Sequence, residues 1–393
     1  MRILIATDAW RPQVNGVVHT LEATARAAKS LGVEISFLTA EGFPTVGLPS
    51  YPGIRIALPR AREIAQRISA LRPDAVHIAT EGPIGWRVRG YCVRHKLPFT
   101  TSFTTRFPEY VSVRTGIPSS VGYAVLRHFH GAAATTMVST PSLKKELSER
   151  GFKKLGLWTR GVNTELFNPD TPANLDLPRP IFLTVGRVAV EKNLEAFLCL
   201  DLPGSKVVIG DGPQKAELQR RFAKAHFLGE KTGKELTALM AAADVFVFPS
   251  LTDTFGVVQL ESLACGTPVA AFPVTGPRDV IEDHPIGALD TDLRSACLRA
   301  LSMSREACRA FALERSWENS ARQFLGNLAA LQQNHAPRAS PLAGQAAVRS
   351  VPDWNIHADS PITTIKRENN GTNHEASRCK GAGFRPRDGR ASL

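Results

Sequence analysis

The sequence lacks the features that would place it outside the cytosol. Its six cysteines form no CxxC pair and no Cys/His cluster at zinc spacing, which favours reduced thiols. No uninterrupted apolar run approaches the length of a membrane span. The run that follows Met1 and Arg2 ends at Asp8, which is too short for a secretory signal. We therefore expect a cytoplasmic protein.

Acidic residues are also in short supply. The chain has 48 Lys and Arg against 36 Asp and Glu, a formal charge of +12, and nine of these bases against five of the acids follow residue 334. The remaining excess is diffuse and comes with no nucleic-acid motif, so we expect no nucleic acid as a partner. A positive body fits an anionic small molecule, or peripheral contact with the anionic inner face of a membrane.

Several familiar chemical motifs are missing. GxGxxG is absent, and GEKTGKE at 229–235 is one residue short of a Walker loop and has Glu where Ser or Thr should hold magnesium. The Asp290-Thr291-Asp292 triplet has the form that metal-dependent sugar transferases use, but it directly precedes a helix-like run. We therefore expect Asp292 to cap that helix and predict no metal site. The scattered histidines, among them His19, His77 and His130, are expected to be structural.

Short apolar runs alternate with helix-like segments twice along the chain, which predicts two doubly wound α/β units in tandem. We expect domains at 1–170 and 171–333, joined by the proline-rich segment 168–180, and a disordered basic tail at 334–393. A last helix is expected near 317–333. The predicted strands are 2–7, 34–39, 54–58, 74–80, 98–102, 181–187, 206–212, 225–229, 244–250 and 267–272. The predicted helices of the first unit are 17–31, 61–71, 84–95, 119–131 and 142–150.

The stretch TDTFGVVQLESLACGTPVAAF, 252–272, carries two carboxylates eight positions apart. Asp253 lies in a loop before a short apolar helix, and Glu261 lies one and a half to two turns into that helix. A capping role explains Asp253 but gives no reason for a carboxylate at Glu261. Eight residues of helix rise about 12 Å, comparable to the distance from a sugar hydroxyl across a diphosphate to a ribose. Between the two acids, the helix N-terminus suits phosphates.

Two further loops carry groups that suit an anion. GRVAVEKN places Arg187 and Lys192 five apart at the end of a strand, where an Arg fork and a Lys charge can hold a diphosphate without a metal. In isolation the pair is better explained as a solvated pair beside Glu191. Asn15-Gly16, in RPQVNGVVHTLE, allows the backbone at a helix start to approach a phosphate.

Together these motifs resemble the retaining nucleotide-sugar glycosyltransferases of the GT-B fold, particularly the bacterial family 4 type with mannosyl, glucosyl and sulfoquinovosyl lipid transferases. The resemblance covers 1–333 in order and includes PQVNGV, PDAVHIATEGPIG, SFTTRFPEY, TRGVNTELFNP, GRVAVEKN, VVIGDGP, HFLG, DVFVFPS, TDTFGVVQLESLACGTPVAAF, GPRDVI and SWE. It implies two Rossmann-like domains that face a cleft.

The resemblance also implies roles for residues. Arg187 and Lys192 would hold the donor diphosphate, Asp253 the hydroxyls of the transferred sugar and Glu261 those of the ribose. The loop around Phe255, Gly256 and Val257 would assist, and Asn15 and Gly16 would close on the phosphates. The implied reaction transfers a hexose, for which we expect mannose, from a GDP- or UDP-sugar to a lipid or glycan with an α linkage, and it needs no metal or other cofactor.

The chain departs from the family at two positions. Asp253 stands where Glu is common, and Thr104 stands where many relatives carry a histidine at the reacting centre; Thr104, or Thr105 and Arg106 on the acceptor side, would have to substitute for it. Three alternatives therefore stay open at this point. They are a nucleotide-sugar sensor that has lost catalysis, another GT-B sugar enzyme such as an epimerase or a phosphorylase, and a nucleic-acid binder.

Overall fold

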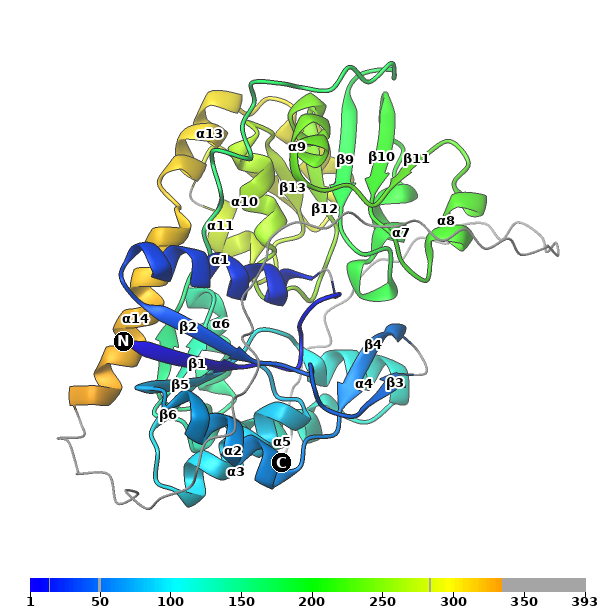
Figure 1. Cartoon of the computed structure of the whole chain (residues 1–393). Coiled ribbons are helices and arrows are strands. Elements are labelled where there is room, and N and C mark those ends of the chain that lie inside the picture. The colour runs from blue at the N-terminus through cyan, green and yellow to red at the C-terminus, as the bar shows by residue number, and fades with distance from the viewer. Residues whose placement is uncertain (14, 49–50, 283, 334–393) are drawn as a thin grey trace, which may run out of the picture. The chain divides into compact units, whose positions relative to one another are not determined.

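The computed structural model describes residues 1–13, 15–48, 51–282 and 284–333, and Figure 1 shows their arrangement. The predicted disordered tail at 334–393 lies outside the described residues. The first half builds a six-stranded parallel sheet in the order β2-β1-β5-β6-β7-β8. Its strands are β1 (Arg2–Ala6), β2 (Glu34–Leu38), β5 (Ala75–Ile78), β6 (Phe99–Ser102), β7 (Thr135–Val138) and β8 (Leu155–Leu157), and its helices are α1 (Gly16–Ser30), α2 (Ala61–Leu71), α3 (Pro83–Arg94), α4 (Phe107–Thr115), α5 (Ser119–Gly131) and α6 (Pro141–Glu149).

The second half builds another six-stranded parallel sheet, in the order β11-β10-β9-β12-β13-β14. Its strands are β9 (Ile181–Val185), β10 (Ser205–Ile209), β11 (His226–Gly229), β12 (Val245–Phe248), β13 (Val269–Ala271) and β14 (Gly287–Leu289). The helices that follow are η1 (Val190–Lys192), α7 (Leu194–Leu198), α8 (Lys215–Arg221), α9 (Gly233–Ala242), α10 (Val257–Ala264), α11 (Pro277–Ile281), α12 (Leu293–Ala300), α13 (Arg305–Leu313) and α14 (Trp317–Gln333). The α/β class with two doubly wound sheets is thus confirmed.

The apolar runs explain why these strands form parallel sheets. β12 reads VFVF and is buried throughout, as is most of β9 with IFLTV, because helices cover both faces of a parallel sheet. Their side chains divide between two separate clusters, with Leu183 and Phe246 in one and Phe182 and Val245 in the other. Alternate residues therefore face opposite layers of helices, as the two-residue period of a strand requires.

One predicted strand takes a different partner. The segment predicted at 54–58 belongs to β4 (Tyr51–Ala57), which pairs antiparallel with β3 (Thr45–Leu48) instead of joining the parallel sheet, so that prediction is wrong. Arg55 is exposed whereas Ile56 and Ala57 after it are less so, and an exposed strand residue is typical of a strand with one solvated face, because parallel strands are buried on both. β3, β7, β8, β14 and α4 have no counterpart among the predicted elements.

The last helix, predicted near 317–333, returns to the first sheet. Phe324 and Leu328 of α14 are fully buried in a cluster with Ile3 and Ile5 of β1. The indole of Trp158, just after β8, donates a hydrogen bond to the hydroxyl of Ser320 at 3.1 Å. The predicted domain boundaries grouped this helix with the second sheet, but its contacts complete the core of the first.

In the part of the chain that the structure describes, no helix is both long enough and apolar enough to cross a bilayer. The five cysteines in these residues (Cys92, Cys199, Cys265, Cys297 and Cys308) form no disulfide.

Candidate functional site

Most of the predicted site residues follow two adjacent central strands. β9 and β12 are neighbours, and the chain proceeds from β9 to β10 on one side and from β12 to β13 on the other. Ligands of doubly wound sheets bind outside the carboxyl ends of the strands where the order reverses in this way. Arg187 and Lys192 follow β9, and Asp253 and Glu261 follow β12. The fold thus brings the four residues to the same edge of the sheet.

Lys192 and Asp253 are in direct contact. The Lys192 Nζ donates to Asp253 Oδ1 at 2.7 Å and Oδ2 at 2.8 Å, with both side chains mostly buried. The amide of Asn193 donates to the carbonyl of Pro249 at 3.0 Å, which ties the two loops together. Burial acts to lower the pKa of Lys192, but the charge of Asp253 and its hydrogen bonds offset this, so the pKa lies above its usual value. Lys192 is therefore a fixed cation.

Asp253 does not cap the helix that follows it. α10 begins after Gly256 with no side-chain hydrogen bond at its N-cap. Gly256 has φ of 80°, and an added Cβ would stand 2.5 Å from the ring of Phe248, so only glycine fits. Phe255 is buried, and its carbonyl accepts a hydrogen bond from the amide of Gln259 at 2.6 Å. The N-terminus of α10, beginning at Val257, thus keeps backbone N–H groups and the positive dipole end for a ligand.

Glu261 is the most unusual acid of this edge. Its side chain is 13% exposed and makes no hydrogen bond among the described residues. Burial raises the pKa of Glu261 to about 7. Nδ1 of His19, on α1 of the first half, lies 4.0 Å from its Oε1. Burial and the positive charge of Arg26 lower the pKa of His19, which disfavours a charged imidazole beside Glu261. An unpaired buried carboxyl is costly unless a ligand bonds to it.

Of the other predicted donor residues, Arg187 belongs to the second half, and Asn15 and Gly16 belong to the first. Arg187 lies half-buried just beyond β9. Asn15 caps α1, since its Oδ1 accepts from the N–H groups of Val17 at 3.0 Å and Val18 at 3.1 Å. Gly16 is exposed, and a Cβ there would meet nothing within 4 Å, which leaves space above the helix start.

The first half contributes the loop with Thr104, Thr105 and Arg106, which follows β6. The hydroxyl of Thr254 donates to the carbonyl of Thr104 at 2.8 Å, and the hydroxyl of Ser139 donates to the carbonyl of Thr254 at 2.9 Å. These bonds hold the Asp253 loop against the first sheet. The Thr104 hydroxyl itself is buried without a partner among the described residues. Thr105 is half-buried beside it.

Arg106, predicted on the acceptor side, is held within the first half. Its guanidinium forms two hydrogen bonds with Glu146, at 2.8 and 2.6 Å, and lies 3.7 Å from Glu109. These carboxylates raise its pKa against the opposing effect of burial. The acceptor role stays a prediction, but the fork is already occupied.

Two neighbours of the site were not singled out from the sequence. Tyr110 of α4 lies beside Asp253 and Lys192 and is hydrogen bonded to Thr252; burial, with Asp253 adding to it, raises its pKa. It lies inside the quoted SFTTRFPEY motif, which was the available signal. His19 was expected to be structural. Only its contact with Glu261, which is distant in the sequence, shows that it is a neighbour of the site. His77 and His130 are buried and hydrogen bonded, as expected of structural histidines.

The predicted cap at Asp292 is confirmed, since its carboxylate accepts from the N–H groups of Arg294 at 3.1 Å and Ser295 at 3.3 Å. The carboxylate that the metal-dependent motif would use is therefore engaged at the start of α12.

Two family models match the chain. One, described as Glycosyltransferase Family 4, matches residues 14–166, and one described as Glycosyl transferases group 1 matches residues 179–302. With two doubly wound sheets and the charged edge beside β9 and β12, these matches define a nucleotide-sugar glycosyltransferase of the GT-B fold. The chain belongs to the family 4 type of these enzymes.

Named relatives extend over most of the chain. The GDP-mannose-dependent alpha-mannosyltransferase of Mycobacterium tuberculosis is 28% identical over 376 residues, which cover 86% of this chain and 99% of the relative. The sulfoquinovosyl transferase of Arabidopsis thaliana is 29% identical, covering 70% of this chain and 60% of the relative. The alpha-monoglucosyldiacylglycerol synthase of Streptococcus pneumoniae is 26% identical, covering 82% and 83%.

Solved structures share the fold. Sucrose-phosphate synthase from Thermosynechococcus elongatus aligns with a TM-score of 0.69 at 20% identity, covering 85% of this chain and all of that one. Anabaena HepE in complex with UDP-glucose aligns with a TM-score of 0.64 at 14% identity, covering 84% of this chain and all of that one.

Proposed function

We propose that this glycosyltransferase moves mannose from GDP-mannose to a lipid acceptor, with retention of the α configuration and without a metal. The observation that carries the proposal is the edge of the second sheet, where Lys192 and Asp253 are paired before the open N-terminus of α10 and the largely buried Glu261 lies on the same helix. The name of the Mycobacterium relative, similar along 86% of this chain, supports mannose and GDP.

The donor would lie across this edge. Arg187 and Lys192 offer a fork and a point charge to the diphosphate, and the free N–H groups of α10 complete its cradle. Asp253 would accept hydrogen bonds from hydroxyls of the sugar. Glu261 would accept those of the ribose, which gives its buried carboxyl the partners that it lacks among the described residues. With the donor bound, Lys192 would contact both Asp253 and the diphosphate, and Asp253 would contact both Lys192 and the sugar. Because the two side chains already hold each other, they are oriented before the donor binds.

The proposed chemistry needs few protein groups. The leaving diphosphate accepts the proton of the acceptor hydroxyl on the same face from which it departs, and this keeps the anomeric configuration. Lys192 and Arg187 stabilise the charge that grows on the diphosphate, while Asp253 positions the sugar. Fixed cations and dipoles of this kind act without reorganising in the transition state.

A lipid acceptor is supported by the name of one relative, the alpha-monoglucosyldiacylglycerol synthase. The exposed arginines of α3, Arg87 and Arg94, would favour the surface of an anionic membrane.

The donor assignment is tested by calorimetry with GDP-mannose, GDP-glucose, UDP-glucose and UDP-sulfoquinovose. We expect tight binding of GDP-mannose and its loss in Glu261→Ala. Glu314→Ala, at an 80% exposed acid of the second half, is the matched control and should bind as the unmodified protein does. Unchanged affinity in Glu261→Ala would refute the ribose role, and preference for another donor would replace mannose or GDP.

Two measurements test the chemistry. The product should show an α linkage by NMR, and turnover should survive treatment with EDTA. A β product would exclude retention, and a full loss of turnover that added magnesium restores would show that the reaction needs a metal.

A binding protein without catalysis is the second candidate, because Thr104, whose hydroxyl has no partner among the described residues, stands where many relatives have histidine. Thr104→His separates the two candidates. A large gain in transfer would indicate an enzyme that has lost activity, whereas a fall from a measurable starting rate would show that Thr104 already serves catalysis.

A further inference from the structure

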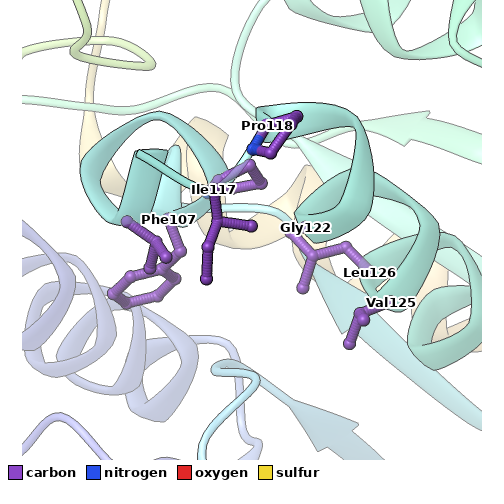
Figure 2. A pocket seen from close by; sticks show the side chains of 8 residues that line it. Phe107, Ile117, Pro118, Gly122, Val125 and Leu126 are labelled. Carbon is purple, nitrogen blue, oxygen red and sulfur yellow. The ribbon is translucent and has the colours of Figure 1, made fainter. Parts of the chain in front are cut away.

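α4 and α5 enclose an apolar hollow that the donor edge does not use. Its volume is about 180 Å³, and its lining is formed by apolar residues and one glycine, as Figure 2 shows. Gly122 of α5 lets the two helices approach, since a Cβ there would stand 2.9 Å from Cβ of Pro108 on α4. We call this hollow, which includes Phe107, Val111, Ile117 and Val125, the α4–α5 groove.

The groove lies in the largest run of exposed apolar side chains in the described part of the chain. The described part of the chain has fifteen exposed large apolar residues, and five of them lie between 107 and 125. Each of the five is between 44% and 53% exposed (Phe107, Val111, Ile117, Val121 and Val125). Apolar surface gathered in this way marks a site that something covers. In comparison, an apolar cavity of about 150 Å³ holds a benzene-sized group, so this hollow fits part of a hydrocarbon chain.

Two aromatic rings lie between the groove and the donor edge. Phe107, at the first position of α4, has its ring 6.5 Å from that of Tyr110. Tyr110 in turn lies beside Asp253 and Lys192. Phe107 also follows Thr104 by three residues, in the loop that Thr254 holds against the second half. An acceptor whose hydroxyl lies next to the sugar that Asp253 would hold could therefore extend past Tyr110 and Phe107 into the groove.

We propose that the α4–α5 groove binds an acyl chain of the lipid acceptor and so selects lipids over free head groups. This inference rests on the proposed function. The lining offers no polar side chain with which a protein segment would be recognised, and a hydrocarbon chain needs none. The neighbouring helix α3 carries three arginines and no acid, and Arg89 donates to the carbonyls of His128 and Phe129 at the end of α5. A cationic flank beside an apolar groove is complementary to lipids at an anionic surface.

A pair of matched variants separates the groove from the surface around it. Val125→Trp fills the groove, whereas Val121→Trp adds the same ring one turn earlier on α5, at a residue that is 53% exposed and does not line it. Both sites are exposed, so we expect both variants to keep the thermal stability and the donor affinity of the unmodified protein. A variant with a lower Tm is replaced by the corresponding Leu substitution.

The binding test uses diacylglycerol with a photoreactive diazirine in one acyl chain, presented in detergent micelles, with adducts mapped by mass spectrometry. We expect labelling to concentrate on residues 107–126, to persist in Val121→Trp, and to fall about tenfold in Val125→Trp. A tenfold loss corresponds to about two methylenes that are no longer buried. Labelling that is scattered, or equal in both variants, would overturn the proposal.

The transfer test compares diacylglycerol with glycerol as acceptors of mannose from GDP-mannose. Val125→Trp should lower transfer to the lipid about tenfold and leave transfer to glycerol unchanged. If no donor gives transfer but the groove is labelled, the proposed function fails and the groove stands. If transfer to the lipid is equal in both variants, the function stands and the groove fails. A dimer that Val125→Trp dissociates without a change in labelling would reassign the face to contact between two copies of the chain.

Discussion

The carboxyl edges of the two sheets differ in how their charged residues are bonded. In the first half Asp8 and Arg106 are hydrogen bonded to other residues of that half, although the Nε of Arg106 is buried without a partner among the described residues. Asp8 accepts from the N–H groups of Ile84 and Gly85 and from the hydroxyl of Thr80, and Arg106 is clasped by Glu146. In the second half Lys192 and Asp253 hold each other, and Glu261 lacks a hydrogen bond among the described residues.

This difference separates a scaffold from a binding surface. A buried charge with all its hydrogen bonds in place stabilises a fold, whereas one that lacks them is costly until a ligand supplies them. The first half therefore presents an edge on which Asp8 and Arg106 are bonded within that half, with an apolar groove beside it, and the second half presents the groups that an anionic donor needs.

The largest effect is expected at Lys192. Lys192→Ala leaves Asp253 mostly buried without its cation and removes the charge predicted to hold the diphosphate, so donor affinity should fall about 100-fold or more. Calorimetry with GDP-mannose measures this. Lys231→Ala removes a lysine that pairs with Glu235 on the surface and is the control. Equal affinities in the two variants would place the donor elsewhere.

Arg106 tests the first half as a scaffold. Because its fork binds Glu146 in a largely buried pair, Arg106→Ala should lower the free energy of unfolding by about 3 kcal/mol, with donor affinity unchanged. Urea denaturation and calorimetry measure the two quantities. Intact stability with a loss of transfer would instead support the acceptor role predicted from the sequence.

Replacing Glu261 should raise the free energy of unfolding at high pH, whereas replacing Arg106 lowers it. Its folded pKa of about 7 lies above the usual 4.5, so ionising it costs stability as pH rises between these values. Glu261→Gln avoids this cost and should raise the free energy of unfolding at pH 8 by up to about 3 kcal/mol, while at pH 4 the two proteins should be alike. Tm against pH measures it, and a pH-independent difference would contradict the burial of an ionisable carboxyl.

The smallest effect is expected at Thr254. Thr254→Val removes the hydroxyl that donates to the carbonyl of Thr104 and should cost about 1 kcal/mol of stability. Thr252→Val, in the same loop, removes a hydroxyl whose bond to the carbonyl of Glu191 is long, at 3.5 Å, and whose other partner is Tyr110. A larger loss for Thr252→Val would show that Tyr110, not Thr104, anchors the loop.

The sequence predicted the fold where local pattern decides it. Continuous apolar runs such as those of β9 and β12 identify buried parallel strands, and these are confirmed. β4 was misplaced, because strand partners depend on distant segments that a local pattern does not contain. β8 and β14 read LGL and GAL, three residues with a glycine in each, and so lack the longer apolar run, TPVAAF, that identified the equally short β13.

The candidate site divides in the same way. Lys192 and Asp253 were placed on one ligand from their loops, and the structure brings them into contact. Arg106 was placed on the acceptor side from its position in SFTTRFPEY, and its pairing with Glu146, forty residues away, could not be predicted from neighbouring residues. His19 and Tyr110 come from the first half to Glu261 and Asp253, and such contacts follow only from the tertiary structure.

The return of α14 to the first sheet gives the chain two covalent crossings between its halves, one through 158–180 and one through 313–317. Two covalent linkages restrain twisting more than one does. A rearrangement of one half against the other is therefore expected to be a rotation about an axis through the two linkages. Shortening the chain before Trp317 would also leave Ile3, Ile5 and Trp158 facing water, and such a truncated enzyme should aggregate instead of merely losing a terminal helix.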